Sequence, residues 1–121
     1  MRVFRFDPDT GKKIEQFGSV DAVFNGILRT RGALQIGVIT LEPGGLVGLH
    51  EAASDQLMLV VGGSGWVRGP DKSWKHFLAI GRSVFWNKGE LHESATETGM
   101  TAVVIEGDGI DPAEFMVEVT E

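Results

Sequence analysis

A chain of 121 residues is enough for one domain, which we expect to span residues 1–121, and is too short for a large two-domain enzyme. Its 11 Lys and Arg residues against 17 Asp and Glu residues give a net charge of −6, which argues against nucleic acid and anionic membrane surfaces as partners. The longest aliphatic run, residues 57–61, falls far short of the ~20 residues of a membrane-spanning helix. The absence of cysteine excludes disulfides and thiol chemistry, and it favours a cytoplasmic location.

Apolar residues alternate with other residues through much of the chain, which is the period of a β-strand. The alternating segments are 3–5, 34–38, 66–68, 74–80, 84–86 and 115–119. Clusters of turn-forming residues separate them, at 7–11, 43–45, 62–65, 69–71, 87–89 and 107–109. Short strands punctuated in this way predict an all-β sandwich or barrel. Residues 18–30 are ambiguous, because their apolar positions also fit one face of a helix.

Two blocks of residues have a spacing typical of a known family. The first runs through Gly44, His50, Ala52, Gln56 and Gly63, and the second through Gly81, Asn87, Gly89, His92 and Thr96. These blocks, residues 44–63 and 81–96, resemble the two motifs of the cupin family. The family pattern has a histidine where this chain has Ala52, a glutamate at Gln56, a proline at Asn87 and an asparagine at Thr96. Arg82 stands where the family commonly has an acid.

The resemblance implies a cupin-type double-stranded β-barrel of the jelly-roll kind, with the even-numbered motif positions facing its interior. It also implies a divalent-metal site, for which this chain retains the imidazoles of His50 and His92 and the amide of Gln56. The expected wall of the cavity is Ala52, Met58 and Trp86. Two imidazoles and one uncharged amide form a weakened ligand set for Fe, Mn, Ni or Zn, which solvent or a bound ligand would have to complete.

Nearby acids offer little to replace the missing carboxylate. Glu51 and Glu93 adjoin the two histidines, so alternation along a strand turns them out of the barrel. Asp55 is next to Gln56 and would face inward only if the register shifted by one residue. His76, which lies outside both blocks, is interpreted as a packing residue.

Three functions remain open on this evidence, and the sequence does not decide whether the chain is an enzyme. The first is a cavity that binds a small molecule at a weak divalent-metal site built from His50, Gln56 and His92. The second is a metal-free binding or sensor module in which the same side chains form hydrogen bonds to the ligand, or act as acid and base. The third is a barrel whose site has decayed.

The glycines at 62–65 do not form a phosphate-binding loop, because neither the Lys-Ser/Thr pair nor a helix follows them. We interpret this segment as a turn. A homodimer is expected, because cupins that resemble this chain are often dimeric and a small barrel cannot turn every aromatic side chain inward. Candidates for the interface are Phe4, Phe6, Phe85 and Trp74.

Overall fold

Antiparallel β-strands make up nearly all the regular structure of the computed structural model, which describes residues 1–71 and 76–120. In chain order the elements are β1 (Arg2–Arg5), the 3-10 helix η1 (Pro8–Thr10), β2 (Lys12–Lys13), β3 (Val23–Phe24), β4 (Gln35–Leu41), β5 (Leu46–Glu51), β6 (Gln56–Arg68), β7 (His76–Ala79), β8 (Arg82–Trp86), β9 (Leu91–Ala95), β10 (Met100–Glu106) and β11 (Val117–Glu118). The all-β prediction is confirmed. Residues 18–30, all of them described, form no helix, and within the described residues no helix is long and apolar enough to cross a membrane.

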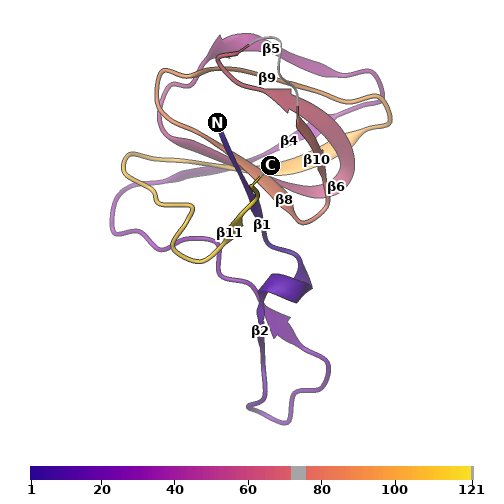
Figure 1. Cartoon of the computed structure of the whole chain (residues 1–121), viewed down its shortest axis with the longest axis vertical. Coiled ribbons are helices and arrows are strands. Elements are labelled where there is room, and N and C mark those ends of the chain that lie inside the picture. The colour runs from indigo at the N-terminus through magenta and orange to yellow at the C-terminus, as the bar shows by residue number, and fades with distance from the viewer. Residues whose placement is uncertain (72–75, 121) are drawn as a thin grey trace.

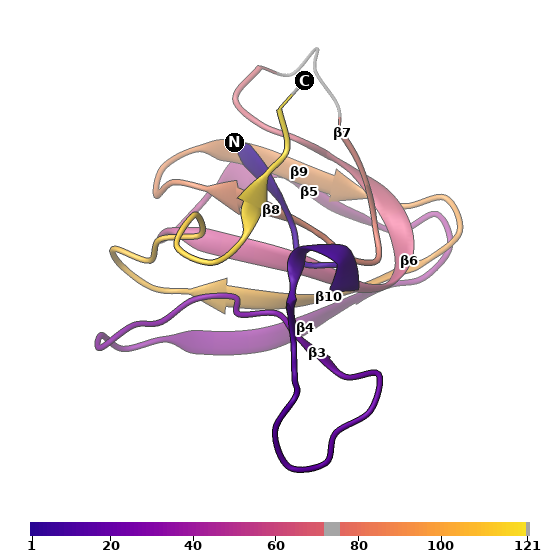
Figure 2. The ribbon, with the colours of Figure 1, turned by 60° about the horizontal axis from the view of Figure 1, so that its bottom comes forward.

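The strands form two layers that share β6. One layer has the order β11-β1-β8-β6-β10-β4, and in the other β9 pairs with both β5 and β6 while β7 pairs with β6. Figure 2 shows β5 and β9 on one side of the barrel and β10 and β4 on the other. The short β2–β3 hairpin extends away from both layers (Figure 1).

The strand β6 crosses from one layer to the other at the glycine cluster. Residues 56–59 pair with β8, whereas residues 64–68 pair with β7 or β9. At the crossing Gly63 has φ of +68°, in the left-handed region that favours glycine, and a Cβ there would collide with the backbone carbonyl of Gly99. The prediction of a turn at 62–65 is therefore wrong, because these glycines bend a continuous strand.

Two apolar clusters lie on opposite faces of the first layer. The cluster inside the barrel contains Met58, Val60, Val84 and Trp86, among others, and the cluster on the outer face is centred on Phe4, Leu57 and Phe85. Side chains from residues 27–34 and 110–116 pack on this outer face.

Phe4 and Phe85 are buried within the chain, and Phe6 packs against them. The proposal that these side chains form a dimer interface is therefore wrong for Phe4 and Phe85, because other side chains of the chain, among them Ile110 and Met116, bury them. Trp74 lies outside the described residues.

Candidate functional site

The structure brings the two motif histidines together across neighbouring strands. His50 on β5 lies directly opposite His92 on β9, and their ring centroids are 4.2 Å apart. The register of this pair of strands shifts between Val47 and His50, so Val47 and His50 face the same side although three positions separate them. The irregularity therefore turns His50 toward the cavity that it shares with His92, although His50 itself remains exposed to solvent.

Both imidazoles line a cavity of the barrel with a volume of about 40 Å³. Its lining consists of Ile39, Leu41, Val47, His50, Gln56, Met58, His92, Ser94 and Met100. A single water needs about 10–15 Å³ by this measure, so the space suits an ion with its waters or a ligand of a few atoms. A mostly apolar wall with a few converging polar groups is typical of small-ligand sites.

The backbone selects the tautomer of each histidine. Nδ1 of His50 lies 2.7 Å from the carbonyl oxygen of Gly48, and Nδ1 of His92 lies 3.2 Å from that of Glu90. Because a carbonyl oxygen only accepts, each Nδ1 carries the hydrogen, and in the neutral ring the lone pair is on Nε2. Burial lowers the pKa of His92, which keeps its imidazole neutral at neutral pH.

The three residues predicted for the cavity wall occupy different positions. Met58 lines the cavity, whereas Ala52 and Trp86 are buried in the adjoining apolar cluster and are not among the described residues of the lining. The indole ring of Trp86 packs against the imidazole of His92, with centroids 4.3 Å apart and planes tilted by 31°. Trp86 therefore packs against the His92 ring from the buried cluster that adjoins the cavity.

Gln56 reaches the cavity from β6 and is hydrogen-bonded to an acid that the sequence analysis missed. Its Nε2 donates to Oε1 of Glu106 at 2.6 Å. Glu106, on β10, lies directly opposite Gln56 in the sheet. It is outside both motifs, and only the pairing of β10 with β6 brings Glu106 to Gln56.

The acids considered from the sequence do not reach the cavity. Glu51 is exposed, and Glu93 forms an ion pair with Arg68 on the outer face, 2.6 Å apart, as alternation predicts. Asp55 accepts a hydrogen bond from the backbone N–H of Lys88 and binds a loop instead of lining the cavity. The register-shift alternative for Asp55 is therefore wrong.

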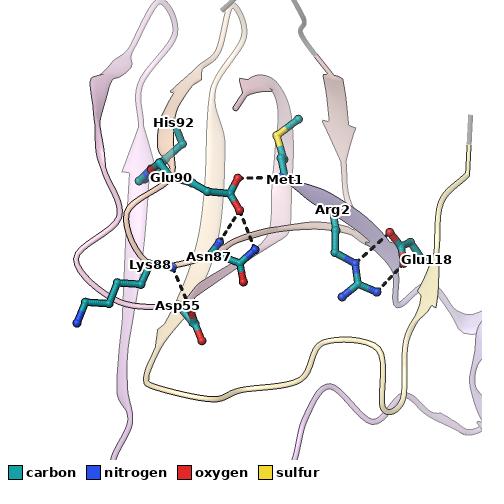
Figure 3. A network of polar contacts seen from close by, with 8 residues as sticks. All are labelled: Met1, Arg2, Asp55, Asn87, Lys88, Glu90, His92 and Glu118. Carbon is teal, nitrogen blue, oxygen red and sulfur yellow. Dashed lines mark hydrogen bonds and ion pairs between the residues drawn. The ribbon is translucent and has the colours of Figure 1, made fainter. Parts of the chain in front are cut away.

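A polar network lies beside the cavity, on the loop before β9 (Figure 3). The carboxylate of Glu90 is 2.8 Å from the α-amino group of Met1 and accepts hydrogen bonds from the backbone and side chain of Asn87. Burial raises the pKa of Glu90, but these hydrogen bonds outweigh it, so the pKa is lowered and the carboxylate is charged. These contacts fix the position of the loop that contains Glu90, and the backbone carbonyl of Glu90 is the partner of Nδ1 of His92.

The donor set fits a metal ion only in part. Within residues 1–71 and 76–120, no group of three or more His, Cys, Asp or Glu side chains could hold a metal. The two imidazoles suit transition metals, and their backbone partners are of the kind that orient histidine ligands. The amide oxygen of Gln56 is the third donor at the cavity, and solvent or a ligand would have to complete the shell.

Comparisons with known proteins agree with this architecture. No protein-family model matches the sequence, and no curated protein matches it. Among solved structures, a cupin superfamily protein from Desulfitobacterium hafniense DCB-2 superposes with a TM-score of 0.58 at 19% identity, over 73% of this chain and 79% of that one. The chain has the cupin fold.

Two further structures show the same cupin fold. A cupin-2 domain containing protein from Shewanella frigidimarina NCIMB 400 matches at 19% identity with a TM-score of 0.54, over 69% of this chain and 78% of that one. A single-substitution variant of the oxalate decarboxylase of Bacillus subtilis matches at 20% identity with a TM-score of 0.58, over 65% of this chain but 22% of that one. At these identities the likeness concerns the fold.

The cupin motif positions have local structural roles here. Gly44, Gly81 and Gly89 have φ of +83°, +91° and +87°, so each occupies a turn conformation that favours glycine. Thr96, in place of the family asparagine, donates its hydroxyl hydrogen to the carbonyl of Ser64 and accepts from a backbone N–H in the following turn. These residues shape the barrel around the histidines.

Proposed function

We propose that this cupin-fold chain binds a small molecule in its barrel cavity at a divalent transition-metal site formed by His50, His92 and Gln56. The observation that carries the proposal is the pair of imidazoles whose Nδ1 atoms are engaged by backbone carbonyls. Their Nε2 lone pairs are left to bind an ion at the shared cavity. Fe, Mn, Ni and Zn are the candidate ions, and as a Lewis acid the bound ion would orient and polarise the ligand.

The shape and charge of the cavity limit the ligand. Its volume of about 40 Å³ suits a molecule of few atoms, and neither lysine nor arginine is among the described residues of its lining. An anionic ligand would therefore depend on the metal for its charge partner. The apolar side chains of Met58 and Met100 offer contacts for the rest of the molecule.

A metal-free binding module is the second candidate. It is favoured by the absence of a three-ligand His, Cys, Asp or Glu cluster within the described residues. In this case the two Nε2 atoms would accept hydrogen bonds from a protic ligand, such as an alcohol or a protonated acid. Both candidates use the same histidines, so metal binding is the property that separates them.

Metal titration tests the proposal. Protein purified without a metal-affinity tag is titrated calorimetrically with Zn²⁺, Ni²⁺, Mn²⁺ and, without oxygen, Fe²⁺. His50→Ala and His92→Ala should each weaken binding by more than the roughly 10–100-fold that loss of an outer-shell partner costs. His76→Ala is the matched control, because His76 lies on β7 outside the cavity lining. If wild type binds none of these ions, the metal site is refuted and the metal-free candidate replaces it.

We also propose that the chain forms a homodimer through β4. This strand lies at the edge of its layer in the described structure, and Ile36 and Val38 on it are 63% and 64% exposed. Residues 35–41 contain no charged residue and no proline, which natural edge strands commonly use to block pairing. An uncharged edge lets two copies of net charge −6 pair without placing like charges opposite each other.

A further inference from the structure

The Gln56–Glu106 pair belongs to a row of side chains that crosses four strands. In the register of the first layer, Gln56 is opposite Trp86 on β8 and Glu106 on β10, and Glu106 is in turn opposite Gln35 on β4. Gln56 lines the inner cavity. Glu106 instead lines a neighbouring groove along β4, with about 160 Å³ open to water-sized molecules, and Ile39 borders both spaces.

The hydrogen bond between these two side chains determines which atom of the amide is available. A carboxylate only accepts, so the Nε2 group of Gln56 must face Glu106, and it lies 2.6 Å from Oε1 of that residue. The carbonyl oxygen Oε1 is then the atom of the amide that remains for the cavity. It is also the atom through which an amide ligates a metal ion, because the NH₂ group has no lone pair to offer.

We infer that Glu106 is a positioning residue that presents Oε1 of Gln56 to the site and supplies, from the adjacent strand, the negative charge that the ligand set lacks. This inference rests on the proposed function. The family pattern has a carboxylate at position 56, whereas here the carboxylate stands one strand away behind an amide. Glu106 is therefore an outer partner of a ligand, of the kind that orients and polarises it.

The surroundings of Glu106 support this role. Within the described part of the chain Glu106 forms no ion pair, so no cation in the fold neutralises its charge. Glu106 is also partly buried, and its carboxylate is hydrogen-bonded to the amide of Gln56.

The first test needs no metal. In ¹⁵N-labelled apoprotein, the side-chain NH₂ signal of Gln56 should show one strongly shifted proton that exchanges slowly with solvent. Glu106→Ala should abolish this signature, and Glu106→Gln, whose own carbonyl can accept the bond, should retain it. Glu114→Ala is the control, because Glu114 is exposed and lies outside the strands that carry the pair. An unchanged Gln56 signal in Glu106→Ala would overturn the inference.

The second test measures zinc affinity and melting temperature of the same variants. Glu106→Ala should weaken zinc binding about 10–100-fold, with Glu106→Gln between it and wild type, because the glutamine variant keeps the orientation and loses the charge. The exchanged pair Gln56→Glu with Glu106→Gln should bind at least as tightly as wild type, since the carboxylate then contacts the ion directly. A purely structural role would lower the melting temperature without this graded order.

The outcomes separate the two levels of the argument. If wild type binds zinc and Glu106→Ala binds it equally well, the role of Glu106 is refuted while the metal site stands. If wild type binds none of the tested ions, the metal site is refuted, and the amide signal then decides whether Glu106 orients Gln56 for a metal-free ligand.

Discussion

Replacing Gly63 with alanine tests the bend that creates the cavity. At φ of +68° an alanine costs about 1–2 kcal/mol. Its Cβ would also collide with the carbonyl of Gly99, and since backbone atoms cannot move aside cheaply, overpacking adds about 1–3 kcal/mol. We expect Gly63→Ala to lower the free energy of unfolding by about 2–5 kcal/mol, a large part of the roughly 5–15 kcal/mol of a typical domain. Urea unfolding followed by tryptophan fluorescence measures the loss.

The adjacent glycine provides a matched control. A Cβ at Gly62 would meet only the side chain of Thr101, at 3.5 Å, which is ordinary van der Waals contact. Because glycine within a strand costs roughly 0.5–1 kcal/mol relative to alanine, Gly62→Ala should leave stability unchanged or raise it slightly. Equal losses in the two variants, or a Gly63→Ala protein as stable as wild type, would refute the argument that β6 changes layer at Gly63.

Three further predictions concern the termini, the second motif and the dimer. Arg2 and Glu118 form an ion pair 2.6 Å apart that is partly exposed, and the hydrogen bond from Arg2 lowers the pKa of Glu118. This pair should add about 0.2–1 kcal/mol to the free energy of unfolding above pH ~4.3, and this contribution should disappear as the pH falls further. The stability difference between wild type and Glu118→Gln should therefore shrink between neutral and acidic pH, and a constant difference in denaturant titrations would contradict this. Thr96→Val should lower the free energy of unfolding by about 1–3 kcal/mol, because it removes the hydroxyl that donates to the carbonyl of Ser64. Thr96→Ser keeps this hydroxyl, so a serine variant as unstable as Thr96→Val would show that the hydrogen bond is not the cause of the loss. Val38→Lys should convert the dimer to a monomer in light scattering, whereas a dimer that survives this change, or a monomeric wild type, would exclude β4 as the interface.

The strands could be predicted because alternation is a local property. Residues 3–5 and 84–86 lie in strands as their apolar pattern indicates, and the turns at 43–45 and 87–89 carry glycines with positive φ. Of the predicted segment 115–119, only residues 117–118 form a strand. The turn predicted at 62–65 was wrong because four small, turn-forming residues are equally suited to a strand that must bend. Which of the two forms depends on the partners of the strand, and those come from distant segments.

The site was predictable as far as motif spacing reaches. Spacing identified His50, Gln56 and His92 as candidate ligands, and the structure places all three on one cavity. It gave no indication of Glu106, fifty positions from Gln56, or of the packing of Trp86 behind His92. Both contacts depend on how strands far apart in the sequence align with each other.

Local patterns in the amino-acid sequence were enough to establish that the chain is all-β and that its two histidine-bearing segments have cupin spacing, because strand parity and turn chemistry act over a few residues. Where charge lies near those histidines, and which faces remain open, follows only from the packed strands. The register of β10 against β6 places Glu106 behind Gln56. A shift of that register by one residue would turn the carboxylate to the opposite face, and nothing local to either strand specifies it.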